Sequence, residues 1–138
     1  MYKRQLKKVD TISLPQIYKG WYFYVLGDAY RYNNQEEKAF PLKLKSQQLF
    51  DLEGNKKMAN AVNYDLHYTL VSQDFLNYDG ASYLNTFLKN AKKNNNNEQL
   101  LTAYLGLSFL GNPSKNINNT LSNLQKATQY TNLSLIHI

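Results

Sequence analysis

The sequence predicts an all-α fold of about three stacked antiparallel helical hairpins that repeat about every 40 residues. The segment VLGDAY, beginning at Val25, recurs in outline as YLGLSF at Tyr104, a shift of 79 residues. A weaker copy, DLHYTL, begins at Asp65, halfway between them. Apolar residues recur at three- and four-residue spacing, which is typical of amphipathic helices with one buried face. No stretch of useful length alternates as a strand would.

The first hairpin is expected over residues 14–53. A polar turn is predicted at Tyr32–Gln35, and Gly54 suits the left-handed residue that ends a helix. Pro41 is the main irregularity, because a proline inside a helix loses a hydrogen bond and clashes with the preceding turn, at a cost of about 3 kcal/mol. The second helix is therefore expected either to begin near Phe40 or to be kinked there.

The second and third hairpins are expected over residues 55–93 and 97–131. Their internal breaks are predicted at Asn77–Gly80 and Gly111–Pro113, and the run Asn94–Asn97 separates the two hairpins. In the last helix, the residues at helical spacing that we expect to be buried are Ile117, Leu121, Leu124 and Thr128.

Both ends of the chain resemble translated sequencing adapter. Met1–Gln5 fits GTG TAT AAG AGA CAG and Leu133–Ile138 fits CTG TCT CTT ATA CAC ATC, which are the two strands of one transposon end. We therefore expect both segments to be artefacts, and residues 6–132 to be one helical-repeat domain that is truncated at both ends. Without the two basic residues of the first segment, the net charge falls from +6 to +4.

Composition narrows the classes of function. The chain has no cysteine, which excludes disulfides, cysteine-based zinc sites and thiol catalysis. Lysines such as Lys43, Lys56 and Lys89 stand near acidic residues or at helix ends, so we interpret them as solvated surface residues. The longest apolar run, Trp21–Leu26, is far shorter than the about 18 to 20 residues that cross a bilayer. We expect no membrane contact from this segment and a cytoplasmic location, although a longer protein containing it could be membrane-attached.

The first hairpin resembles the tetratricopeptide repeat family, whose signature is an aromatic residue, Leu-Gly, a second aromatic residue and a small residue that opens the second helix. The residues that match at the family's spacing, and that are expected to pack within the repeat, are Phe23, Leu26, Gly27, Tyr30 and Ala39. The second copy keeps Leu66 but has His67 in place of the small glycine. The third copy keeps Leu105, Gly106 and Phe109. Gly27 and Ala39 are small because the two helices of the hairpin are expected to cross closely there.

The resemblance implies a binding surface. Stacked hairpins of this family usually hold a peptide or partner helix in a concave groove lined by the first helix of each hairpin. The family's spacing places on that groove Trp21, Tyr24, Asp28, Arg31, Tyr64 and Tyr68, followed by Leu100, Ala103 and Leu107. Tyr, Trp and Arg are frequent binding hot spots. The alternative is that several of these aromatic residues pack against a neighbouring repeat.

No residue pattern indicates catalysis, a metal or a cofactor. His67 has no second histidine or cysteine within sequence reach, so we interpret it as a packed or partly exposed helix residue. Glu36 and Glu37 are adjacent, which points their side chains apart, and are expected to favour a helix start. Neither P-loop nor dinucleotide-binding spacing occurs. We therefore expect a protein that is not an enzyme and needs no cofactor.

The expected function is a non-catalytic module that binds a protein or peptide. The resemblance further implies the sensor or scaffold region of a larger bacterial regulator of the histidine kinase or transcription factor type. One alternative is a free-standing scaffold for complex assembly. A second is a helical repeat that binds single-stranded nucleic acid, which the aromatic and lysine side chains at Tyr18–Tyr22 suggest. Against this second alternative, the basic residues do not converge on one stripe.

Overall fold

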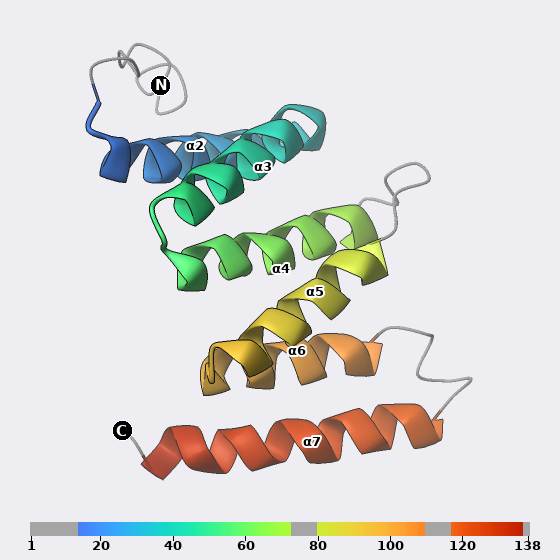
Figure 1. Cartoon of the computed structure of the whole chain (residues 1–138). Helices are drawn as coiled ribbons and strands as arrows, with labels where there is room; N and C mark the ends of the chain where they lie inside the picture. The colour runs from blue at the N-terminus through green and yellow to red at the C-terminus, as the bar shows by residue number, and fades with distance from the viewer. Residues whose placement is uncertain (1–13, 73–79, 110–116, 137–138) are drawn as a thin grey trace. The chain divides into compact units, whose positions relative to one another are not determined.

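The described part of the computed structural model covers residues 14–72, 80–109 and 117–136, with only the backbone described at several helix ends. Every secondary-structure element within these ranges is a helix (Figure 1). The helices are α2 (Gln16–Tyr32), α3 (Glu36–Leu52), α4 (Lys56–Ser72), α5 (Gly80–Lys93), α6 (Asn97–Phe109) and α7 (Ile117–Ile136). The predicted all-α class is confirmed for these residues. None of these helices is long and apolar enough to span a membrane.

The chain divides into two compact units. The N-terminal unit, Met1–Tyr78, contains α2, α3 and α4, and the C-terminal unit, Asp79–Ile138, contains α5, α6 and α7. Within the first unit α3 packs on both α2 and α4, and within the second α6 packs on both α5 and α7. Consecutive helices therefore pack within each unit, as predicted. The expected second hairpin, residues 55–93, has one helix in each unit, so a continuous stack with a fixed period stays a prediction.

Three helix connections share one turn geometry, namely those between α2 and α3, α3 and α4, and α5 and α6. Each has three residues, and the middle residue is left-handed, with φ of 59° at Asn34, 76° at Gly54 and 52° at Asn95. The N–H of each third residue donates to the carbonyl five residues earlier, at 2.9, 2.8 and 3.0 Å. These are Schellman endings, in which the left-handed residue turns the chain back onto the helix. The predicted role of Gly54 is confirmed.

Two of these turns also start the next helix. The Asn55 side chain accepts a hydrogen bond from the Met58 N–H at 3.2 Å, and the Asn96 side chain accepts one from the Gln99 N–H at 3.1 Å. Such bonds satisfy N–H groups that the first turn of a helix leaves unpaired. In each of these two turns, a single asparagine therefore ends one helix with its backbone N–H and caps the next with its side chain.

The start of α3 differs from one of the two predicted alternatives. The helix begins at Glu36, directly after the turn, and Pro41 lies inside it on the exposed side. A start near Phe40 is therefore wrong. The turn at residues 33–35 leads directly into the helix, which has already begun when the chain reaches the proline. Glu36 and Glu37 occupy the first turn, as predicted, where carboxylates complement the positive end of the helix dipole.

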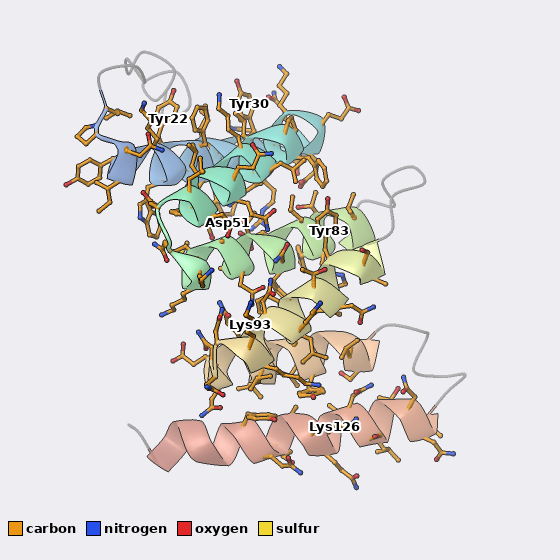
Figure 2. All side chains as sticks on the ribbon, in the orientation of Figure 1. Tyr22, Tyr30, Asp51, Tyr83, Lys93 and Lys126 are labelled. Atoms are coloured by element: carbon orange, nitrogen blue, oxygen red, sulfur yellow. The ribbon has the colours of Figure 1, made fainter. Side chains whose placement is uncertain are left out.

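The core of the N-terminal unit agrees with the predicted repeat motif. Leu26, Tyr30 and Ala39 form a buried cluster. Tyr22 packs against it, and Figure 2 labels Tyr22 and Tyr30 on α2. Leu66 of α4 is also fully buried. The sequence spacing therefore identified the correct buried face of the first hairpin.

The C-terminal unit departs from the predicted register. Its buried cluster consists of Ala91, Leu100, Tyr104 and Ala127. Leu105 is exposed, although the motif predicted packing there, whereas Leu100 and Ala103, predicted to line a groove, are buried. The reason is that α6 packs between α5 and α7 and buries two sides. Gly106 is buried as expected, and the side chain of Phe109 lies outside the described residues.

The predicted buried stripe of α7 is wrong. Its apolar members Ile117, Leu121 and Leu124 are 64%, 51% and 38% exposed, and Thr128 is exposed as well. The face of α7 that packs carries Asn123, Ala127 and Tyr130 instead. The Tyr130 ring stacks on Tyr104 of α6, with 5.8 Å between centroids and 7° between planes. A small alanine and this ring pair set the rotation of α7, so Leu121 and Leu124 point outward.

Candidate functional site

Six residues of the predicted groove lie in the N-terminal unit, four on α2 and two on α4. Trp21 and Tyr68 are 42% and 54% exposed, and the other four side chains are half-buried. We call these six residues the α2/α4 surface: Trp21, Tyr24, Asp28, Arg31, Tyr64 and Tyr68. The predicted groove residues of the third hairpin belong to the other unit. Leu107 is half-buried against the core of that unit.

Lys43 of α3 lies beneath this surface, and its predicted solvated position is wrong. Its side chain is only 3% exposed. The aliphatic part lies against Gly27 of α2, where a Cβ would stand 3.1 Å from Lys43 Cγ. Gly27 is thus small because a lysine stem occupies the space beside it, whereas the predicted partner was Ala39. Ala39 packs one turn away, with Leu26 and Tyr30.

The ammonium group of Lys43 joins the two helices that flank α3. It forms an ion pair with Asp28 of α2 and, at 3.3 Å, with Asp65 of α4, to which it donates a hydrogen bond. The same nitrogen lies 3.3 Å from the centroid of the Tyr24 ring. A buried cation is costly unless it is paired. Two carboxylates and an aromatic face compensate the desolvation of this one.

Tyr24 and Arg31 complete the charge network. Burial raises the pKa of the Tyr24 phenol, and the negative charges of Asp65 and Asp28 and a hydrogen bond with Asp65 raise it further. Burial lowers the pKa of the Arg31 guanidinium, but Asp65 and Asp28 outweigh it and the net shift is upward. Tyr24 therefore stays protonated at neutral pH and Arg31 stays charged. The charges of Lys43 and Arg31 are therefore offset by those of Asp28 and Asp65.

Arg31 also reaches across to α4. Its guanidinium carbon lies 5.9 Å from the centroid of the Tyr68 ring and 5.7 Å from that of Tyr32. These distances fall within the range of cation–π attraction. The two outer helices of the unit are therefore linked through Lys43, through the hydrogen bond between Tyr24 and Asp65, and through Arg31.

Aromatic packing holds the other end of the surface. Trp21 meets Tyr24 edge to face, with 5.8 Å between ring centroids, and meets the fully buried Phe50 in the same way at 5.3 Å. Phe50 lies so close to Gly20 that a Cβ there would stand 2.9 Å from its ring. Gly20 and Gly27 are seven residues apart and lie on one helix face, which is the sequence signal for two close approaches of α3 to α2.

The α4 residues of the surface form a smaller group. Tyr64 lies near His67, with 5.9 Å between ring centroids. Burial raises the pKa of the Tyr64 phenol, and Tyr68 and Asp65 add to the effect. His67 is buried, which agrees with its interpretation as a packed helix histidine.

Sequence reasoning assigned neither Lys43 nor Asp65 to this site. For Lys43 the sequence contains a usable signal, because it falls between Ala39 and Ser46 in a stripe that is otherwise small or apolar. A lysine in such a stripe requires a carboxylate partner on a neighbouring helix. Asp28 was on the predicted surface, so only Asp65 had no signal of its own.

Neither a metal site nor a known relative identifies the protein. Within the three described ranges, no three histidine, aspartate or glutamate side chains gather as metal ligands would. No protein-family model, curated protein or solved structure matches the chain. The tetratricopeptide-like assignment is therefore a resemblance carried by the motif of the first hairpin.

Proposed function

We propose that the chain is a non-catalytic interaction module and that the α2/α4 surface binds a protein or peptide partner. The observation that supports this most directly is the buried Lys43, which ties α2 and α4 together under the exposed rings of Trp21 and Tyr68. Exposed aromatic side chains on a rigid support lose little conformational entropy on binding, and Trp and Tyr are enriched among hot spots.

The charge balance of the network limits the chemical class of partner that we expect. Asp28 and Asp65 already face Lys43 and Arg31, so the surface offers no excess charge to a phosphate backbone or to an acidic segment. Affinity then comes from aromatic contact, and an extended peptide or a helix with an apolar face fits that chemistry. We therefore do not propose single-stranded nucleic acid as the ligand.

The wider context is part of the same proposal. The motif of the first hairpin and the packing of consecutive helices support a tetratricopeptide-like repeat of about 40 residues, with three hairpins over residues 14–53, 55–93 and 97–131. We propose that this repeat is the sensor or scaffold region of a larger cytoplasmic or membrane-attached bacterial regulator that needs no cofactor. A free-standing assembly scaffold is the alternative use of the same surface.

A displayed peptide library tests the surface directly. Peptides selected on the native chain are expected to bind the Trp21→Ala and Tyr68→Ala variants at least about tenfold more weakly, the loss expected at hot spots. These two residues are better probes than Tyr24, because their side chains are exposed, whereas Tyr24 is half-buried over the Lys43 ammonium.

Leu52→Ala is the matched control. Leu52 is an apolar residue of α3 that is 77% exposed and lies outside the α2/α4 surface. Its replacement is expected to leave peptide affinity unchanged. Equal binding by all three variants, with native circular dichroism, would show that the partner binds elsewhere.

A further inference from the structure

Arg31 is a cation of the α2/α4 surface with which no carboxylate of the described residues is in contact. Both ion pairs of the charge network are made by Lys43. Asp65 and Asp28 act on the Arg31 guanidinium from a longer distance, and the side chain with which it shares a hydrogen bond is Tyr32. An arginine carries five N–H donors in a planar fork. Several donors of this guanidinium therefore have no acceptor among the described residues.

Two aromatic rings restrict the position of the Arg31 guanidinium. Its carbon lies 5.7 Å from the centroid of the Tyr32 ring and 5.9 Å from that of the Tyr68 ring. Both tyrosines are exposed, whereas Arg31 itself is half-buried. A guanidinium that is already held in place loses little conformational entropy when it forms further hydrogen bonds. The N–H groups of Arg31 are therefore prepared for an acceptor that a partner brings.

The partner has to supply that acceptor, because its binding removes water from Arg31. A peptide that covers the Tyr68 ring also covers the neighbouring guanidinium and displaces the water that hydrates the N–H groups. A donor that loses water without gaining an acceptor weakens binding by its desolvation cost.

The charge balance of the network favours a neutral acceptor. The charges of Lys43 and Arg31 are already offset by two carboxylates, so a third carboxylate would add an unbalanced charge at a half-buried site. The neutral acceptor that every peptide carries is the main-chain carbonyl. In a helix all but the last four carbonyls are bonded within the helix, whereas an extended segment leaves its carbonyls available. The donors of Arg31 therefore favour an extended peptide over a helix.

We propose that Arg31 donates hydrogen bonds to a main-chain carbonyl of the partner, which binds the α2/α4 surface as an extended peptide. This inference rests on the proposed function and names the form of partner that the surface takes. In this arrangement the rings of Trp21 and Tyr68 contact apolar parts of the peptide, and Arg31 holds its backbone.

An ester scan of a bound peptide tests the proposal. The probe is the tightest-binding peptide selected on the native chain from the displayed library, synthesised with one main-chain amide at a time replaced by an ester. An ester carbonyl accepts hydrogen bonds more weakly than an amide carbonyl. At one position the ester is expected to weaken binding to the native chain about fivefold, part of the loss expected for a hydrogen bond to a charged group. The same ester should have little effect on Arg31→Met, which lacks the donors.

Three variants of the chain complete the titration calorimetry, each measured well below its own unfolding midpoint. Arg31→Met should weaken binding of the unmodified peptide about tenfold or more. Arg31→Lys should recover only part of that loss, because it restores the charge but not the planar fork. Lys45→Met is the matched control and should leave the affinity unchanged. Lys45 is exposed outside the α2/α4 surface, and its ammonium also lies against an aromatic ring, 4.5 Å from the centroid of Phe23.

The outcomes distinguish this proposal from the function on which it rests. Unchanged binding by Arg31→Met, or esters that weaken binding equally to the native chain and to Arg31→Met, would overturn the role of Arg31. So would a peptide that loses its dependence on Arg31 when an acidic side chain or its terminal carboxylate is neutralised. In each of these cases Trp21→Ala still weakens binding if the proposed function is correct. No loss of affinity in either Trp21→Ala or Tyr68→Ala would overturn the proposed function itself.

Discussion

The two units of this chain stabilise three-helix packing by different means. In the N-terminal unit the middle helix inserts a charged side chain, Lys43, between its neighbours and pairs it with a carboxylate from each. In the C-terminal unit the middle helix presents Leu100 and Tyr104 to a core of apolar and aromatic side chains. The comparison shows that the same helical pattern can enclose either a charge network or an apolar core. Hydrophobic spacing predicts neither the charge network of the first unit nor the face of α7 that packs in the second.

The largest expected effect is at Lys43. Replacing it with methionine keeps most of its volume but removes the buried ammonium from two half-buried carboxylates, Asp28 and Asp65, which then keep Arg31 as a cationic neighbour. Removing one partner of a buried ion pair lowers the free energy of unfolding by about 3 to 5 kcal/mol. Urea unfolding measures the loss, and hydrogen exchange should show it in peptides of α2, α3 and α4 but not in those of α6 and α7.

A compensated variant separates the charge effect from packing. Adding Asp28→Asn and Asp65→Asn to Lys43→Met removes the stranded carboxylates, so the triple variant should recover much of the lost stability. Recovery would assign the loss to unpaired charge. If Lys43→Met alone were neutral, the ion pairs would contribute nothing and the contrast between the two units would disappear.

The next largest effect on stability is expected in the C-terminal unit, where a buried leucine is compared with an exposed one. Leu100→Ala removes a buried side chain of the core cluster and should cost about 2 to 4 kcal/mol. Leu121→Ala, on the exposed side of α7, should cost less than about 0.5 kcal/mol. Thermal unfolding of both variants measures the difference. Equal losses would mean that α7 buries the face that hydrophobic spacing alone predicts.

The smallest effect concerns Glu36 in the first turn of α3. One of its carboxylate oxygens is buried and has no hydrogen-bond partner, and burial raises the pKa of this carboxyl while Arg31 partly opposes the shift. A carboxyl whose pKa is higher in the folded state stabilises the fold at low pH and loses that contribution as the pH rises through the raised pKa. Glu36→Gln should therefore raise the melting temperature slightly at pH 7, offset in part by the lost interaction with the helix dipole.

The pH dependence of the Glu36→Gln effect tests whether the gain in melting temperature comes from the charge of Glu36. The gain from Glu36→Gln should shrink as the pH falls through the raised pKa and vanish below the ordinary pKa of glutamate, where both side chains are neutral. Glu37→Gln, at the exposed neighbouring position, is the matched control and should show no such gain. A gain that is the same at all pH values would point to a packing effect.

Local chemistry made much of the fold predictable. Asn and Gly residues that tolerate a left-handed backbone placed the turns at residues 33–35, 53–55 and 94–96 within a residue or two, because their effect is independent of tertiary contacts. In the first hairpin, Leu26, Tyr30 and Ala39 were identified correctly because large apolar residues occupy the packed face.

The errors have a common physical cause. Lys43 is buried because carboxylates on other helices neutralise it, and no local pattern records such partners. On α7, Ala127 and Asn123 take the buried face because a small side chain permits close approach and a tyrosine pair aligns the helices. Hydrophobic spacing ranks leucine above alanine, so it selected the wrong face. The six residues of the α2/α4 surface were chosen by family spacing, and contacts among them were found for Trp21, Tyr24, Arg31 and Tyr68.

The burial of Lys43 should make its amino group less reactive than the amino groups of exposed lysines. Reagents that acylate lysine need an accessible, unpaired amino group, and the Lys43 amino group is enclosed by two carboxylates and a phenol ring. Lys45, two residues later and exposed, is open to the same reagents in the folded protein. Acylation of Lys43 relative to Lys45 therefore records how often α2, α3 and α4 separate. The N-terminal unit carries its own chemical reporter of opening, readable by mass spectrometry without any added label site.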